Sequence, residues 1–190
     1  MRTAAGRTLH LSDGRRVLLR PIRESDAAEI VQAWGRLSRQ SRYLRFMQHK
    51  KSLDLSVLER GVRPAAGECA LVATIPADDG IDIVGAARFV PASRPDAGAA
   101  EASAATDRSC EFAITVAEDW RGCGLSTALL SSLVRRARRA GYDAICGDVL
   151  ADNGPMLALA RRLKFEVLPQ PDDATLVRVR RVLRPAQRTK

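Results

Sequence analysis

The part of the sequence best suited to chemistry is a short glycine-containing segment, Asp119-Trp120-Arg121-Gly122-Cys123-Gly124-Leu125-Ser126, between an expected strand and an expected helix. Glycine lets the backbone turn tightly and lets a ligand approach the main chain closely. The first turn of the following helix offers unpaired N–H groups and a partial positive charge, which together attract an anion. Arg121 adds a fixed cation. The segment therefore predicts a phosphate-binding loop, and the alternative is an ordinary tight turn into a helix.

This loop matches neither of two common nucleotide-binding motifs. In a P-loop, Lys and then Ser or Thr follow the second glycine, whereas here Leu125 and Ser126 follow Gly124. The dinucleotide fingerprint has a third glycine that this loop lacks. The sequence therefore indicates neither of these two classes.

Composition bounds the class of protein that carries the loop. The chain has 190 residues, of which 46% are hydrophobic and 28% charged, which is typical of a single globular domain over residues 1–190. We find no apolar run long enough to span a membrane and no signal peptide, so we expect neither a membrane protein nor a secreted one. The net charge of +9 favours phosphate-bearing partners, but an aromatic content of 4% is low for stacking on single-stranded nucleic acid.

Cysteine usage predicts the compartment and argues against a metal. Cys69, Cys110, Cys123 and Cys146 form no C-x-x-C pair, and their spacing to the two histidines fits no zinc pattern. Three of the four lie in apolar runs, where cysteine is usually a small buried hydrophobe. We therefore expect a reducing, cytoplasmic protein with no disulfide and no structural metal.

Hydrophobic periodicity and turn residues predict a mixed α/β order. Loose tails are expected at 1–13 and 184–190, and a long loop at 91–109. Asp26 and Glu29 suggest a capping box at the first helix, and Asn153 is a candidate cap for the last one. Strands are expected at 16–20, 68–75, 81–90, 110–116, 144–150, 165–168 and 176–183. Helices are expected at 26–37, 38–46 and 125–140, and after Asn153.

The loop residues also resemble a known family. Arg121-x-x-Gly124-x-Ser126 is similar to the [Q/R]-x-x-G-x-[G/A] signature of the GNAT superfamily of acetyl-CoA-dependent N-acetyltransferases. Leu163-Lys164-Phe165-Glu166 stands where the family usually has L-G-F-E. The segments 41–46, 110–114 and 153–156 are most similar to the GNAT domain of Pat-like protein lysine acetyltransferases. The resemblance covers about residues 15 to 183.

The resemblance implies a fold, a co-substrate and most of a site. It implies a GNAT fold, with a mixed, mostly antiparallel sheet of six to seven strands and about four helices. The implied co-substrate is acetyl-CoA and the implied acceptor is the amine of a protein lysine; a small amine or a protein N-terminus is the alternative. Strand residues contact pantetheine and loop amides hold the pyrophosphate. The implied cofactor-binding residues are Ile114, Thr115, Val116, Arg121, Gly122, Cys123, Gly124, Leu125, Ser126 and Asn153.

Three positions depart from the family pattern. Ser126 replaces a smaller Gly or Ala, and Lys164 replaces the glycine before Phe165. Ala160 occupies the position at which many members carry a tyrosine, their usual general acid toward the leaving thiolate. A thiol pKa near 8.5 makes the thiolate a fair leaving group, so we expect water to supply this proton.

Glu111 is the candidate general base, because Pat-like enzymes place a glutamate on the corresponding strand. A free lysine amine is almost wholly protonated at pH 7, and making it nucleophilic costs about 4.6 kcal/mol. A nearby carboxylate can remove that proton directly or through one water. Strand alternation places Glu111 on the same side as Ala113 and Thr115. The alternatives are an exposed edge position or an ion pair with an arginine.

Other functions and partners stay open from the sequence alone. A GNAT-shaped domain could sense acetyl-CoA without catalysis, as Ala160 and Ser126 suggest. A nucleic-acid-binding protein is suggested only by the charge, so we do not expect that partner. The basic run at 135–139 is usually a solvent-exposed face, and the alternative is a contact with the 3′-phosphate of coenzyme A. A homodimer is common in this superfamily.

Overall fold

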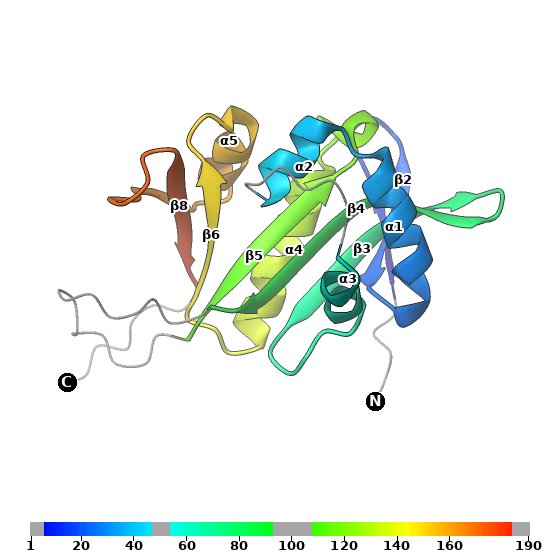
Figure 1. Ribbon diagram of the computed structural model, residues 1–190, viewed down its shortest axis with the longest axis horizontal. Coiled ribbons are helices and arrows are strands. Elements are labelled where there is room, and N and C mark those ends of the chain that lie inside the picture. The colour runs from blue at the N-terminus through cyan, green and yellow to red at the C-terminus, as the bar shows by residue number, and fades with distance from the viewer. Residues whose placement is uncertain (1–5, 47–53, 93–107, 184–190) are drawn as a thin grey trace.

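The computed structural model describes residues 6–46, 54–92 and 108–183, which form one eight-stranded sheet with helices on both faces (Figure 1). The order across the sheet is β1-β2-β3-β4-β5-β6-β8-β7, and every neighbouring pair is antiparallel except β5 with β6. The strands are β1 (Arg7–His10), β2 (Arg16–Pro21), β3 (Cys69–Ala77), β4 (Gly80–Pro91), β5 (Ser109–Val116), β6 (Ala144–Leu150), β7 (Glu166–Pro169) and β8 (Leu176–Val182).

Five α-helices lie in the described part of the chain. In Figure 1, α1, α2 and α3 lie in front of the sheet and α4 lies behind it. None of the described helices combines the length and apolar character that crossing a membrane requires. The helices are α1 (Ala27–Arg36), α2 (Arg39–Phe46), α3 (Leu55–Val62), α4 (Leu125–Arg139) and α5 (Gly154–Arg162).

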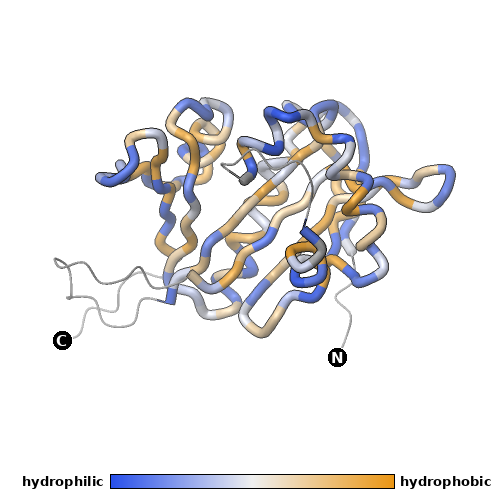
Figure 2. Tube along the Cα trace, viewed as in Figure 1, coloured by the Kyte–Doolittle hydropathy of each residue, from blue (hydrophilic) through white to orange (hydrophobic). Residues whose placement is uncertain are grey.

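The core lies between α4 and the middle of the sheet. One stripe of α4, with Leu125, Leu129, Leu133 and Ala137, is 0% exposed and belongs to the main hydrophobic cluster together with residues of β4 and β5. Residues three and four apart fall on one face of a helix, so the four-residue spacing of these side chains produces a buried stripe. Figure 2 shows hydrophobic residues along the central strands and hydrophilic ones in the outer turns.

The sheet opens between β5 and β6. Their parallel pairing extends only from Ser109 opposite Ala144 to Glu111 opposite Cys146, although both strands continue beyond these residues. Past that point β5 pairs only with β4, and β6 pairs only with β8. The two strands visibly diverge in Figure 1. The result is a wedge inside the sheet with one unpaired edge of β5 exposed to it.

The mixed α/β class with a mostly antiparallel sheet is confirmed, but the expected N-terminal tail and the expected number of strands were wrong. Part of the expected tail at 1–13 forms β1, because Arg7–His10 pairs along the whole of its length with β2. The sheet thus has one strand more than the six to seven expected. Helix α3 was not predicted at all. The expected tail at 184–190 and most of the 91–109 loop lie outside the described residues.

Asp26 does not act as the expected helix cap. Its buried carboxylate accepts two hydrogen bonds of 2.7 Å from the guanidinium of Arg20, and a third of 2.8 Å from the amide of Arg23. Glu29 is likewise engaged elsewhere, with Arg36 at 2.5 Å. The capping box failed because a neighbouring strand supplies a stronger, bidentate partner. This ion pair fixes the junction between β2 and α1.

The junction predicts an acid-sensitive part of the stability. Burial raises the pKa of Asp26. The hydrogen bonds from Arg20 and Arg23 and the charge of Arg20 together lower the pKa by a larger amount, so the pKa lies below its usual value. A carboxyl whose folded pKa lies below its unfolded value near 3.9 contributes stability above about pH 4, which is lost as the pH falls through the folded pKa. Asp26→Asn should therefore lower the free energy of unfolding by about 3 kcal/mol at pH 7 and by less than that at pH 3.

Urea denaturation at both pH values measures this difference, with Asp172→Asn as the control because Asp172 is exposed. An Asp26→Asn variant as stable as wild type at pH 7 would contradict the assignment.

Candidate functional site

The loop between β5 and α4 has the backbone geometry of an anion site. Gly122 and Gly124 have φ of 75° and 88°, in the left-handed region that favours glycine. An added Cβ at either position would meet no atom within 4 Å, so conformation rather than space requires glycine here. Gly124 caps α4, and its carbonyl accepts the first helical hydrogen bond, from Ala128 at 3.1 Å. The three preceding amides have no acceptor within the helix and point out of its N-terminus.

The segment between β1 and β2 contacts this loop and holds it in place. The guanidinium of Arg15 lies 4.0 Å from the ring centre of Trp120 and donates to the carbonyl of Asp119 at 3.0 Å. The amide of Ser12 donates to the carbonyl of Cys123 at 3.1 Å. The Cys123 thiol is buried and donates to the carbonyl of Trp120 at 3.0 Å. Cys123 therefore stabilises the turn.

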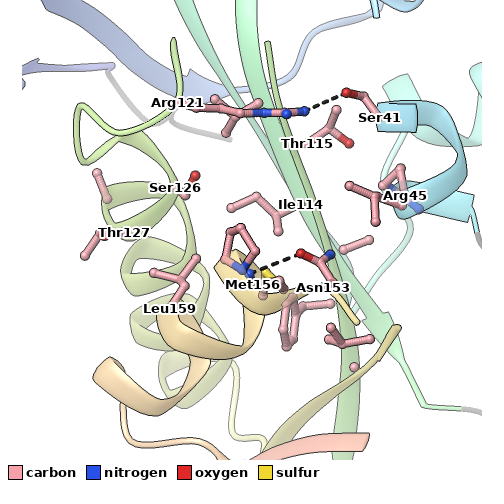
Figure 3. Close-up of a pocket in the computed structure, with 18 of the residues that line it drawn as sticks. Ser41, Arg45, Ile114, Thr115, Arg121, Ser126, Thr127, Asn153, Met156 and Leu159 are labelled. Atoms are coloured by element: carbon pink, nitrogen blue, oxygen red, sulfur yellow. Dashed lines mark hydrogen bonds between the residues drawn. The ribbon is translucent and has the colours of Figure 1, made fainter. Parts of the chain in front are cut away.

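A second network joins the loop to α2. Glu118 accepts hydrogen bonds from the amide of Ser38, at 3.0 Å, and from the hydroxyl of Ser41. Burial raises the pKa of Glu118, but these hydrogen bonds outweigh it and lower the pKa to about 2. Arg121 donates to the Ser41 hydroxyl at 2.6 Å and lies 3.8 Å from Glu118, as Figure 3 shows in part. The arginine is thus held at the mouth of the loop by an ionised carboxylate.

A cavity of about 960 Å³ occupies the wedge between β5 and β6 and continues to the loop. In Figure 3, Ile114 lies between Ser126 of α4 and Arg45 of α2, and α5 closes the lower side. Cys123 and Leu125 are 3% and 0% exposed, and their side chains do not line the cavity. The expected site residues that line it are Glu111, Ile114, Thr115, Val116, Arg121, Gly122, Gly124, Ser126 and Asn153.

Glu111 lies where the wedge closes, and it is in an ion pair. Its Oε1 accepts from Arg178 of β8 at 2.7 Å, and the same guanidinium contacts Asp148 of β6 at 3.1 Å. Burial lowers the pKa of Arg178, but Glu111, Cys146 and Asp148 outweigh it and raise the pKa. Arg178 therefore joins three strands at the point where β5 and β6 separate. Glu111 is still 39% exposed and lines the cavity, so a ligand in the wedge can reach it.

Asn153 caps α5 as expected. Its side-chain oxygen accepts from the amide of Met156 at 3.2 Å, and Pro155 lies in the first turn of the helix. Ala160 is 0% exposed, inside the core rather than in the cavity. No tyrosine lines the cavity in the part of the chain that the structure describes. The general acid that the family usually has is therefore not replaced from another position there.

A smaller cavity of about 170 Å³ lies on the opposite side of β5, among α1, α3 and β4. Its walls are mostly apolar, and Ala113, Thr115 and Arg45 line both cavities. Arg88 also lines the smaller one. Burial lowers the pKa of Arg45, and the charge of Arg88 lowers it further, to about 10. The two cavities thus meet at β5 beside two mutually repelling guanidiniums.

Sequence reasoning missed the parts of the cavity that come from α2, β6 and α5. Helical spacing was the available signal, because residues three and four apart share a face. It applies to Ser41, Leu44 and Arg45 on α2, and to Pro155, Leu159 and Arg162 on α5. On β6, the missed residues Gly147 to Val149 lie just beyond the last residue that pairs with β5. The segments 41–46 and 153–156 take part in the family resemblance, but no spacing in them indicates a ligand, so the assembled fold was needed to place these residues in the cavity.

Comparisons with known proteins agree with this geometry. A family model described as "Acetyltransferase (GNAT) domain" matches residues 16–166. The Pseudomonas aeruginosa protein "Acetyltransferase PA5475" is 32% identical over 168 residues, which are 88% of this chain and 84% of that protein.

Solved structures give the same result. The GNAT domain of S. lividans PAT is similar with a TM-score of 0.79 and 25% identity, over 94% of this chain and 97% of that one. The acetyltransferase yncA of Salmonella typhimurium, solved with acetyl-CoA, is similar with a TM-score of 0.66 over 91% of this chain and 96% of its own. Its 19% identity shows the fold alone. The fold expected from the sequence resemblance is thereby confirmed.

The left-handed conformation of the loop predicts the effect of adding a methyl group. Gly124→Ala should lower the free energy of unfolding by about 1–2 kcal/mol, because alanine is strained at a φ of 88°. Gly35→Ala, in α1, is the matched control: its Cβ meets no atom within 4 Å and its φ is not positive, so it should be neutral or stabilising. Chemical denaturation compares the two. Equal effects would contradict the strain assigned to the loop.

Proposed function

The chain belongs to the GNAT family of acetyltransferases, and we propose that it transfers the acetyl group of acetyl-CoA to a protein lysine, with Glu111 as the general base. The family uses acetyl-CoA as its co-substrate, so the chain is an acetyl-CoA-dependent acyltransferase. The observation that carries the finer proposal is the arrangement of the wedge. The proposed anion-binding loop between β5 and α4 lies at the open end of the wedge, and the accessible carboxylate of Glu111 lies at its closed end.

The dimensions of the wedge suit coenzyme A. From Val116 to Glu111, β5 spans about 17 Å at about 3.3 Å per residue. With the pyrophosphate at the loop amides, the pantetheine arm would extend into the wedge. Its amide groups would pair with the free edge of β5 like an added strand, satisfying backbone groups that β6 leaves unpaired. The thioester would then lie toward Glu111.

The acetyl transfer requires the protein to position the thioester and the amine and to supply one general base. A neutral amine attacks the thioester carbonyl carbon, the C–N bond forms and the C–S bond breaks. Glu111 takes the amine proton directly or through one water. Water protonates the departing thiolate, since no tyrosine lines the cavity in the described part of the chain. Arg178 acts as a positioning residue that holds the Glu111 carboxylate at the closed end of the wedge.

The smaller cavity is the proposed route of the acceptor. Its apolar walls suit the aliphatic part of a lysine side chain, and it meets the wedge at Ala113 and Thr115. The sequence resemblance to Pat-like protein lysine acetyltransferases supports a protein acceptor. A small amine or a protein N-terminus would use the same route.

Two observations favour a second candidate, an acetyl-CoA sensor without turnover. Glu111 is bound to Arg178, and the described cavity lining contains no tyrosine acid. Such a domain would bind acetyl-CoA but acetylate nothing in a broad panel of lysine peptides, small amines and protein N-termini. Robust acetylation of any acceptor would exclude it.

The remaining expectations concern location and assembly. The four cysteines are free, which fits the proposed reducing, cytoplasmic location. No group of metal-binding side chains is found among the described residues. A homodimer stays a prediction.

Replacing the proposed base should separate catalysis from binding. Glu111→Gln should lower kcat at pH 7 by about 10²- to 10⁴-fold, while acetyl-CoA affinity stays nearly unchanged. The loss should shrink as the pH rises toward about 10, because the acceptor amine then loses its proton without a base. Steady-state rates against pH, with calorimetry for binding, measure both effects.

Glu166→Gln is the matched control, because Glu166 is exposed on β7 and does not line the wedge. It should leave the rates unchanged. If Glu111→Gln matched wild type at pH 7, Glu111 would lose the role of base, but acetyl-CoA binding and the family would be unaffected.

A further inference from the structure

The wedge continues outward as a groove between α4 and α5. Thr127 and Ser131 line it from α4, and Leu159 and Arg162 line it from α5. Arg162 is exposed, and its guanidinium donates to the Thr127 hydroxyl at 2.5 Å. Within the described residues, no carboxylate forms an ion pair with Arg162, so its charge is available to a ligand. The groove therefore combines two hydroxyls and a guanidinium beside the N-terminus of α4.

Other basic groups near the wedge are engaged or distant. Arg121 is held by Ser41 and Glu118, and Arg45 lies across the cavity on α2. The basic run of α4 does not line the cavity, and its Arg135 donates to the Ser132 hydroxyl. The expected alternative, in which that run contacts a phosphate of the co-substrate, therefore has no support from the geometry. Among the described arginines, Arg162 is the one placed to serve the groove.

We infer that Arg162 and Thr127 form a subsite for the 3′-phosphate of coenzyme A, so that the protein selects coenzyme A over 3′-dephospho-coenzyme A. The inference rests on the proposed function, with the pyrophosphate at the loop amides. In coenzyme A, one ribose separates the 3′-phosphate from the pyrophosphate. Thr127 comes directly after Ser126, which is the last of the loop residues. A 3′-phosphate that contacts Thr127 therefore lies beside the loop.

The donors of the subsite match a phosphate monoester. The planar guanidinium of Arg162 can donate two parallel hydrogen bonds to phosphate oxygens. The Thr127 hydroxyl accepts from Arg162, which leaves its own hydrogen free to donate to the same phosphate. The hydrogen bond to Thr127 also holds the flexible arginine in place. Charge-assisted hydrogen bonds of this kind change affinity by about tenfold or more.

Calorimetric titration with two probes tests the subsite without relying on activity. Wild type should bind coenzyme A about tenfold or more tightly than 3′-dephospho-coenzyme A. Arg162→Gln should lose that preference, because its affinity for coenzyme A falls while its affinity for the dephospho form stays within about twofold. Arg162→Lys, which keeps the charge but loses the fork, should fall between them. Arg161→Gln is the matched control, since Arg161 is exposed on the same turn but does not line the groove.

The other outcomes would contradict the subsite, and one of them would also contradict the proposed function. An Arg162→Gln variant that keeps the preference, or that weakens both probes equally, would overturn the subsite and leave the proposed function intact. A wild type that binds both probes equally would do the same. A wild type that binds neither probe would contradict the proposed function itself and this inference with it.

Discussion

The parallel pairing of β5 with β6 ends at Glu111 and Cys146, and the proposed functional site depends on that early separation. A strand edge in the middle of a sheet would normally be paired along its length, because unpaired backbone groups are costly away from water. Here the edge of β5 faces a cavity of about 960 Å³. A ligand with amide groups can complete this edge, and the pantetheine arm of coenzyme A is such a ligand. Arg178 keeps the geometry of the opening constant, because it joins Glu111 to Asp148 at its closed end.

The second constraint is the rigidity of the loop at the open end. An anion site made of main-chain amides works only if those amides are already in position, since reorganising them would consume binding energy. Two independent networks hold the loop: Arg15 and Ser12 from the N-terminal segment, and the Glu118–Ser41–Arg121 network from α2. The second network also connects the proposed co-substrate site to α2, whose Arg45 lines the proposed acceptor cavity. Binding at the loop and the shape of the acceptor side are therefore physically linked.

The sequence predicted those features that depend on local patterns. The stripe of α4, the Asn153 cap and the glycine turn before α4 were all visible as spacings or residue types, and each is present in the structure. Pairing between distant segments was not visible. Nothing local in residues 7–10 distinguishes a strand from a tail, because β1 exists only through β2. Asp26 resembled a helix cap until the fold placed Arg20 against it. Likewise, Arg162 became a candidate only when α5 packed beside α4.

The central claim is that the wedge and the loop together bind acetyl-CoA. Calorimetric titration of the wild-type protein with acetyl-CoA, and in parallel with S-acetylpantetheine, tests it most directly, because the second ligand enters the wedge but has no phosphate for the loop. The account predicts one-to-one, micromolar binding of acetyl-CoA and binding of S-acetylpantetheine that is weaker by about tenfold or more. Equal affinities would show that the loop is only a turn. The absence of acetyl-CoA binding at sub-millimolar concentration would contradict the account as a whole.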